Sequence, residues 1–196
     1  MVAYVVIPGI DGSDGQHWQS RWQQAWGGAA VRIAPRSWSA PELADWVSAV
    51  QTAYEAVGGA REPVVLVAHS LGCWAAACWL EGARPEGAAA FLVAPPDPRG
   101  PAFPRAQAPS FASLAARRLP CPALVVAGED DPYCAPDVSA SLARRWGARW
   151  ESGGPYGHLN SASGLGDWPA GRALLGSLVG GAGWRGRRAG SGAGAA

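Results

Sequence analysis

Serine, histidine and carboxylate side chains occur in this 196-residue chain in an order that could support nucleophilic catalysis. A serine hydroxyl is a poor nucleophile until a histidine takes its proton, and that histidine needs a carboxylate that fixes its tautomer. Ser70 is the candidate nucleophile, because it ends an apolar, β-branched run that starts at Val64 and precedes a helix-forming segment. The chemistry that such a set performs is attack on a carbonyl carbon.

The residues around Ser70 predict a strand, a sharp turn and a helix, which is the shape of a nucleophile elbow. The residues two before and two after the serine must be small in such a turn. Gly72 meets this requirement, whereas Ala68 stands where glycine is commoner. The alternative is an ordinary strand–turn–helix in which Ser70 only caps the helix.

Three histidines are available to act as the base. His69 adjoins Ser70, and its side chain should leave the turn in another direction. His17 lies in a tryptophan-rich helix, where we expect a helix-start hydrogen bond or a place in the pocket floor. His158 lies in a glycine-flanked loop beyond the last short strand, at the sheet edge where sites form in parallel sheets. His158 is therefore the preferred base.

The acid should follow an intermediate strand, and residues 123–127 form an apolar run that three carboxylates follow, Glu129, Asp130 and Asp131. Spacing alone does not choose among them. The resulting order of serine, acid and histidine is the α/β-hydrolase order, which differs from that of the two other serine-protease arrangements.

Composition bounds the remaining classes of function. The chain is 48% hydrophobic and 16% charged with a net charge of +1, which fits one globular domain over residues 1–179 and gives no case for a nucleic-acid or membrane partner. Residues 180–196 are rich in glycine and alanine and predict a flexible tail. All 16 basic residues are arginine, which excludes a Walker A loop and lysine-imine chemistry.

The four cysteines have no zinc-type spacing, so we expect reduced, buried thiols and neither a metal nor another cofactor. Residues 2–7 form an apolar strand without a preceding basic region, which predicts a cytoplasmic protein without a secretion signal.

Strands alternate with helices along the chain, which predicts an α/β fold with a mostly parallel central sheet and helices on both faces. Trp18, Trp22 and Trp26 recur on one helical face that should pack on the sheet. Residues 39–42 form a capping box, and Asp167 could cap the last helix. Expected strands are 2–7, 31–33, 64–69, 88–94, 123–127 and 148–151, and expected helices are 16–26, 43–57, a segment after Ser70, 138–146 and about 167–179.

The chain resembles the RBBP9/YdeN family of small serine hydrolases, a minimal branch of the α/β-hydrolase fold without a full cap domain. The matching stretches are Val6–Gly9 with His17–Gln19, His69–Cys73, Asp131–Cys134, and Gly157–Asn160 with Gly166–Gly171. The resemblance implies Ser70 as nucleophile, His158 as base and Asp131 as acid, since the family acid directly precedes the proline of an Asp-Pro pair.

An oxyanion hole needs two backbone donors. The Leu71 N–H, directly after the nucleophile, is one, and the Ile10 N–H is our choice for the second, with Asp11 as the alternative. The proline-rich passage from Pro95 to Pro109 is either a partial lid or a plain connector. Expected pocket residues are Pro8, Gly9, Asp11, His17, His69, Pro95 and Tyr133.

These features predict a serine hydrolase that cleaves a small-molecule acyl ester, with thioesters and amides as further substrates, in a shallow pocket suited to short acyl groups. One alternative is a non-catalytic protein-interaction module on a hydrolase fold. A weaker alternative is a cysteine nucleophile, Cys73 or Cys134.

Overall fold

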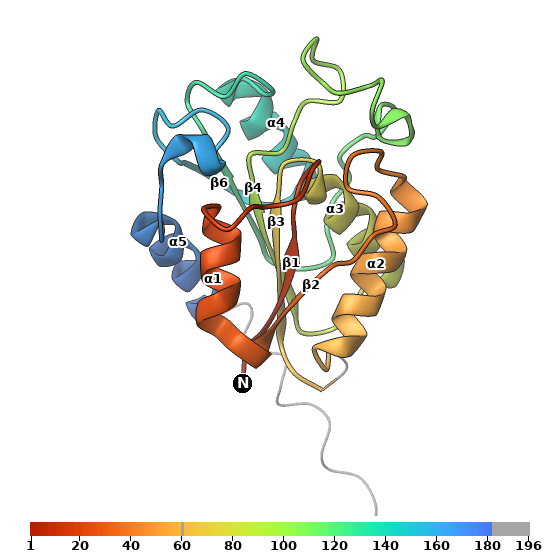
Figure 1. Cartoon of the computed structure of the whole chain (residues 1–196), viewed down its shortest axis with the longest axis vertical. Coiled ribbons are helices and arrows are strands. Elements are labelled where there is room, and N and C mark those ends of the chain that lie inside the picture. Colours follow the sequence, from red (N-terminus) through yellow and green to blue (C-terminus); the bar gives the residue numbers. More distant parts are fainter. Residues whose placement is uncertain (60, 182–196) are drawn as a thin grey trace, which may run out of the picture.

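The computed structural model describes residues 1–59 and 61–181, which form a six-stranded sheet between two layers of helices (Figure 1). Every pair of neighbouring strands is parallel, in the order β2-β1-β3-β4-β5-β6. This is the α/β-hydrolase type of sheet that the sequence predicted, and the described residues contain no cap domain. The predicted tail from residue 180 lies, from residue 182 onward, outside the described residues.

The observed elements follow the predicted ones closely. The strands are β1 (Ala3–Ile7), β2 (Ala30–Arg32), β3 (Val64–His69), β4 (Ala88–Val93), β5 (Ala123–Ala127) and β6 (Arg149–Ser152). The helices are α1 (Trp18–Trp26), α2 (Leu43–Ala56), α3 (Gly72–Ala83), α4 (Pro136–Trp146) and α5 (Pro169–Gly180), with short 3₁₀ turns η1 (Gly27–Ala29), η2 (Pro109–Phe111) and η3 (Ser161–Ser163).

The central strands are apolar along their whole length because helices cover both faces of the sheet. Every residue of β3 and β4 is buried. Successive side chains of a strand point to opposite faces, so Leu66 packs in one core while Val65 and Val67 pack in the other. Helices α2, α3 and α4 cover the first face, and α1 and α5 cover the second.

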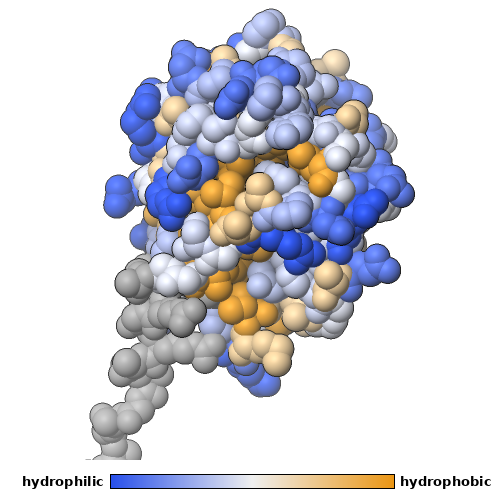
Figure 2. Space-filling model, turned by 90° about the vertical axis from the view of Figure 1, so that its left-hand side faces the viewer, coloured by the Kyte–Doolittle hydropathy of each residue, from blue (hydrophilic) through white to orange (hydrophobic). Residues whose placement is uncertain are grey.

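The tryptophan stripe of α1 packs as predicted. Trp18 and Trp22 are fully buried and meet edge to face, with ring centroids 4.7 Å apart. Trp26 stacks on Tyr4 of β1 at 3.9 Å, and Trp22 stacks on Trp168 at 5.8 Å. Seen from the side that α1 and α5 cover, the surface carries hydrophobic patches between hydrophilic residues (Figure 2).

Two predicted helix caps are wrong. Helix α2 has Glu42 at its N-cap position without a side-chain bond, and the Leu43 N–H donates to the Ser110 hydroxyl at 3.0 Å instead. Helix α5 has Trp168 at its N-cap, so Asp167 does not cap it. The Asp167 carbonyl accepts a hydrogen bond from the Trp22 indole at 2.7 Å. At α2 a residue distant in sequence takes the role that local spacing had assigned, whereas at α5 no side chain caps the helix.

The passage from Pro95 to Pro109 has no helix or strand before η2 begins, in agreement with the prediction. Phe103, Ala108 and Phe111 are buried against the core of α2 and α3. The passage is therefore anchored by its own apolar side chains, and it runs past the edge of the sheet where β3 ends (Figure 1).

Candidate active site

Ser70 lies in the sharp turn between β3 and α3, as the elbow pattern predicts. Its φ of 55° is in the left-handed region, which is strained for a residue with a side chain. The Ser70 N–H donates to the Val93 carbonyl at 2.9 Å, which ties the turn to the end of β4. Such a backbone lifts the hydroxyl out of the sheet edge.

Glycine is required at two positions beside the turn. A Cβ on Gly72 would collide with the backbone carbonyl oxygens of Ile7 and Pro8, and a Cβ on Gly9 would lie 2.7 Å from the Ser70 Cβ. Gly72, two residues after the serine, therefore makes room for the end of β1. Ala68, within β3, is fully buried and accommodated.

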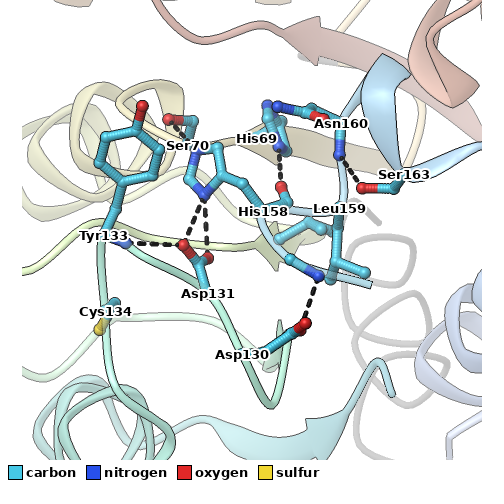
Figure 3. Close-up of polar contacts among 12 residues, drawn as sticks. His69, Ser70, Asp130, Asp131, Tyr133, Cys134, His158, Leu159, Asn160 and Ser163 are labelled. Atoms are coloured by element: carbon cyan, nitrogen blue, oxygen red, sulfur yellow. Dashed lines mark hydrogen bonds and ion pairs between the residues drawn. The ribbon is translucent and has the colours of Figure 1, made fainter. Parts of the chain in front are cut away.

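The structure brings Ser70, His158 and Asp131 into one hydrogen-bonded line (Figure 3). The His158 Nε2 lies 2.8 Å from the Ser70 Oγ, and its Nδ1 lies 3.0 and 2.9 Å from the two Asp131 carboxylate oxygens. Because a carboxylate can only accept, Nδ1 carries the proton and Nε2 is left to accept the serine hydroxyl. The Asp131 side chain is fully buried, and that of His158 is 10% exposed.

The three neighbouring carboxylates have different hydrogen-bond partners. Asp131 is the one that faces the imidazole, and it also accepts the Tyr133 N–H at 2.9 Å. Asp130 accepts the Gly157 N–H at 2.7 Å, and Glu129 accepts the Ser152 hydroxyl at 2.7 Å.

The two other histidines lie close to His158 but not in its line. His17 is the N-cap of α1, where its Nδ1 accepts the Gln19 N–H at 3.2 Å, and burial lowers its pKa to about 4. His69 is fully buried, which lowers its pKa well below the usual value, and its Nε2 lies 2.9 Å from the His158 carbonyl oxygen. Both rings are therefore neutral at pH 7.

The two expected oxyanion donors lie on the loop after β1 and at the start of α3, and both residues line the cavity beside Ser70. The N–H groups of Ile10 and Leu71 have no hydrogen-bond acceptor within the described part of the chain. The Asp11 N–H, the alternative donor, already donates to the Trp38 carbonyl at 3.0 Å. Geometry thus leaves Ile10 and Leu71 with free donors.

A cavity of about 490 Å³ opens beside Ser70, within the range of small-molecule sites. Of the expected pocket residues, Gly9, Asp11, His17, His69 and Tyr133 line it. Pro8 and Pro95 do not, because the proline-rich passage reaches the cavity through Pro96, Pro104 and Gln107. The prediction missed five further lining residues, Gly12, Asp14, Asn160, Ser161 and Ala162, the last three of which follow His158 closely in sequence.

The two candidate nucleophilic thiols are poorly suited to that role. Cys73 is fully buried, which raises its pKa well above the usual value, and its Sγ lies 3.3 Å from the Val93 carbonyl oxygen. Burial and nearby carboxylates raise the pKa of Cys134 to about 12. Since the thiolate is the reactive form, neither cysteine is activated.

The described residues form neither a metal site nor a membrane-spanning helix. Across residues 1–59 and 61–181, no group of three or more His, Cys, Asp or Glu side chains is placed to hold a metal ion. None of the helices in those ranges combines the length and the apolar character that a bilayer crossing demands.

The fold and the site geometry define an α/β-hydrolase with a serine, histidine and aspartate in line. The chain belongs to the serine hydrolase family, whose model matches residues 4–177. It is a serine hydrolase, and this assignment favours an enzyme over the interaction module that the sequence also allowed.

Several solved structures share the fold of this chain. A YdeN-like hydrolase from Pectobacterium atrosepticum is 28% identical, with a TM-score of 0.77 over 91% of this chain and 90% of that one. The ydeN gene product of B. subtilis is 21% identical, with a TM-score of 0.72 over 92% and 99%. A thermophilic esterase from Thermogutta terrifontis shares the fold at 15% identity, with a TM-score of 0.65 over 91% and 89%. A comparison with curated proteins gave no match.

The contact of Gly72 with β1 predicts the effect of a single methyl group. Gly72→Ala places that methyl against backbone oxygens, which cannot move aside cheaply, and should lower the free energy of unfolding by about 2–3 kcal/mol. Gly82→Ala is the matched control, because it lies in the same helix with open space around it and should stabilise the protein slightly. Urea denaturation measures both, and equal stability of the two variants would contradict the packing argument.

Burial of His17 predicts a loss of stability in mild acid. The unfolded chain binds a proton near the usual histidine pKa of 6.5, whereas the folded protein binds it only near 4. The unfolded state therefore carries more protons between these values, and stability falls as the pH drops below 6.5. From this residue alone we expect a loss of about 2 kcal/mol between pH 7 and pH 5.

The variant His17→Gln cannot be protonated, and its stability should change less over the same pH interval. Denaturation curves at pH 7 and pH 5 test this. Parallel losses in the wild type and the variant would show that His17 does not cause the acid sensitivity.

Proposed function

We propose that this serine hydrolase cleaves small acyl esters through an acyl-enzyme, with Ser70 as nucleophile, His158 as base and Asp131 as the acid that orients it. The observation that carries the proposal is the unbroken line from the Ser70 hydroxyl through the imidazole to the buried carboxylate. Each neighbour activates the next: Asp131 fixes the tautomer of His158, and His158 accepts the serine proton.

In the first half of the reaction, the Ser70 Oγ forms a bond to the substrate carbonyl carbon while its proton passes to the His158 Nε2. The carbonyl π electrons move to oxygen and give a tetrahedral oxyanion. The intermediate collapses as the bond to the leaving oxygen breaks and His158 returns the proton to that oxygen. In the second half, water attacks the acyl carbon and gives its proton to the His158 Nε2. The bond to the Ser70 Oγ then breaks, His158 returns the proton to that oxygen, and the carboxylic acid leaves.

The oxyanion needs donors that are in place before the charge develops. The free N–H groups of Leu71 and Ile10, one on each side of the Ser70 turn, are the donors that we assign to it. Gly9 allows the loop that carries Ile10 to approach the serine closely.

The cavity supports a neutral, small substrate. Its lining contains the carboxylates of Asp11 and Asp14, and no arginine is among the described residues around it. An anionic substrate would meet like charge there without a compensating cation. Thioesters and amides use the same chemistry with a different leaving atom and stay within the proposal.

Three further expectations from the sequence stay predictions. The proline-rich passage forms part of the cavity wall through Pro96, Pro104 and Gln107, and its role as a partial lid or a plain connector stays a prediction. The cytoplasmic location expected from the N-terminal sequence likewise stays a prediction, as does the absence of a nucleic-acid partner.

The role of Ser70 is tested by a fluorophosphonate probe, which labels activated serines. The wild type should be labelled and should hydrolyse p-nitrophenyl acetate, whereas Ser70→Ala should lose both signals, with at least about a 10³-fold loss of kcat. Cys73→Ala, at the second residue of α3, is the matched control and should keep both signals. Labelling of Ser70→Ala at the wild-type rate would show that another residue is the nucleophile.

Substrate selection is tested with p-nitrophenyl esters of different length and charge. We expect kcat/KM to be about tenfold higher for acetate and butyrate than for octanoate, because the cavity is small, and about tenfold higher than for the succinate monoester, because of the acidic lining. Asp14→Asn should reduce the difference in kcat/KM between the butyrate ester and the succinate monoester. Preference for octanoate or for succinate would contradict the proposed substrate class.

A further inference from the structure

His158 lies on a segment whose sequence gives it little stiffness of its own. Residues 153–160, here called the base loop, join β6 to η3 without regular structure and contain glycine at 153, 154 and 157. Leu159 has a φ of 49°, a left-handed conformation that a leucine adopts only when its surroundings impose it. Contacts from outside the base loop must therefore hold His158 in place.

Three consecutive residues of the base loop are each bonded through the backbone to a side chain from another element. The Gly157 N–H donates to the Asp130 carboxylate at 2.7 Å. The His158 carbonyl accepts from the His69 Nε2 at 2.9 Å, and the Leu159 carbonyl accepts from the Trp18 indole at 2.8 Å. Figure 3 shows the first two of these bonds beneath and beside the His158 ring.

The two donors to carbonyl groups come from rigid and buried parts of the fold. His69 is the last residue of β3, directly before Ser70, and is 4% exposed. Trp18 is the first residue of α1 and is 1% exposed. Because a carbonyl oxygen can only accept, the His69 proton in this bond lies on Nε2. The Trp18 bond is buried and the His69 bond is partly buried, and removal from water strengthens such hydrogen bonds.

These bonds act on a different part of His158 than Asp131 does. Asp131 fixes the tautomer and rotation of the ring through Nδ1. The bonds from His69 and Trp18 fix the backbone from which the ring extends, and His69 belongs to the same strand end that carries the nucleophile. A small displacement of that backbone would lengthen the 2.8 Å separation between the ring and the Ser70 hydroxyl.

We propose that His69 and Trp18 are positioning residues, which hold the base loop so that the His158 ring stays within hydrogen-bonding reach of Ser70. This inference rests on the proposed catalytic role of His158. It assigns a function to the histidine beside the nucleophile and to one tryptophan of the α1 stripe, beyond their place in the core.

The tryptophan stripe offers a matched pair of variants. Trp18→Phe and Trp22→Phe each remove one indole N–H that donates to a backbone carbonyl, but the Trp22 bond is partly buried and goes to Asp167, outside the base loop. Both variants should lower the melting temperature by similar amounts. Only Trp18→Phe should lower kcat, by about tenfold with KM within about twofold, because the change acts on the geometry of the reacting groups. Equal kcat values for the two variants would overturn the assignment of Trp18.

His69 is tested by keeping or removing its donor. His69→Gln retains an N–H of similar reach, whereas His69→Leu fills similar space without one. We expect kcat to fall about tenfold in His69→Leu and to be partly restored in His69→Gln. If the two variants have the same kcat, the hydrogen bond does not position the base and the assignment of His69 fails.

Ser70→Ala, measured in the same assays, distinguishes a failure of the positioning role from a failure of the proposed function. An inactive Ser70→Ala together with unchanged kcat in Trp18→Phe and His69→Leu would overturn only the positioning role. Activity retained in Ser70→Ala would overturn the proposed function, and the positioning role with it.

Discussion

The hydrogen bond between Ser70 and His158 is the geometric requirement that the sheet and its loops together meet. It joins residues 88 positions apart in the chain and requires two atoms to meet at 2.8 Å. The parallel sheet makes this possible, because β3, β5 and β6 all end at the same edge and deliver the serine, the aspartate and the histidine there. Only β4 lies between β3 and β5, and β6 is next to β5. Short loops after these strands therefore suffice to bring the three side chains together.

Burial gives the site its electrostatic character. Three histidine rings lie in a row, with centroids of His17 and His69 4.7 Å apart and those of His69 and His158 5.0 Å apart. In the proposed reaction His158 becomes positively charged for a moment, and a charged neighbour would oppose that step. Because burial lowers the pKa of both His17 and His69, the two rings stay neutral and leave the Asp131 carboxylate as the charge that acts on His158.

Much of this arrangement could be predicted from the sequence, because the features that reveal it are local. Apolar runs predict the strands, and the order of serine, acid and histidine predicts which strand ends carry them. The choice of Asp131 over Asp130 came from the family resemblance. The Asp131 carboxylate faces the His158 imidazole, whereas the Asp130 carboxylate accepts a backbone N–H. This difference depends on the geometry of the turn and not on the residue types.

Features that depend on contacts between residues far apart in the sequence could not be predicted from it. The cap at the start of α2 comes from Ser110 and not from a neighbour in sequence. Likewise, Pro96 lines the cavity and Pro95 does not, since adjacent residues in an extended passage point in different directions. The same holds for the two bonds that the base loop receives from His69 and Trp18, since nothing in the spacing of residues 18, 69 and 159 relates them. Ser70 and Leu159 both have a left-handed backbone, and each makes a backbone hydrogen bond to a buried residue, Val93 and Trp18 respectively. Contacts at the sheet edge, without a cap domain in the described residues, therefore position the serine and the histidine.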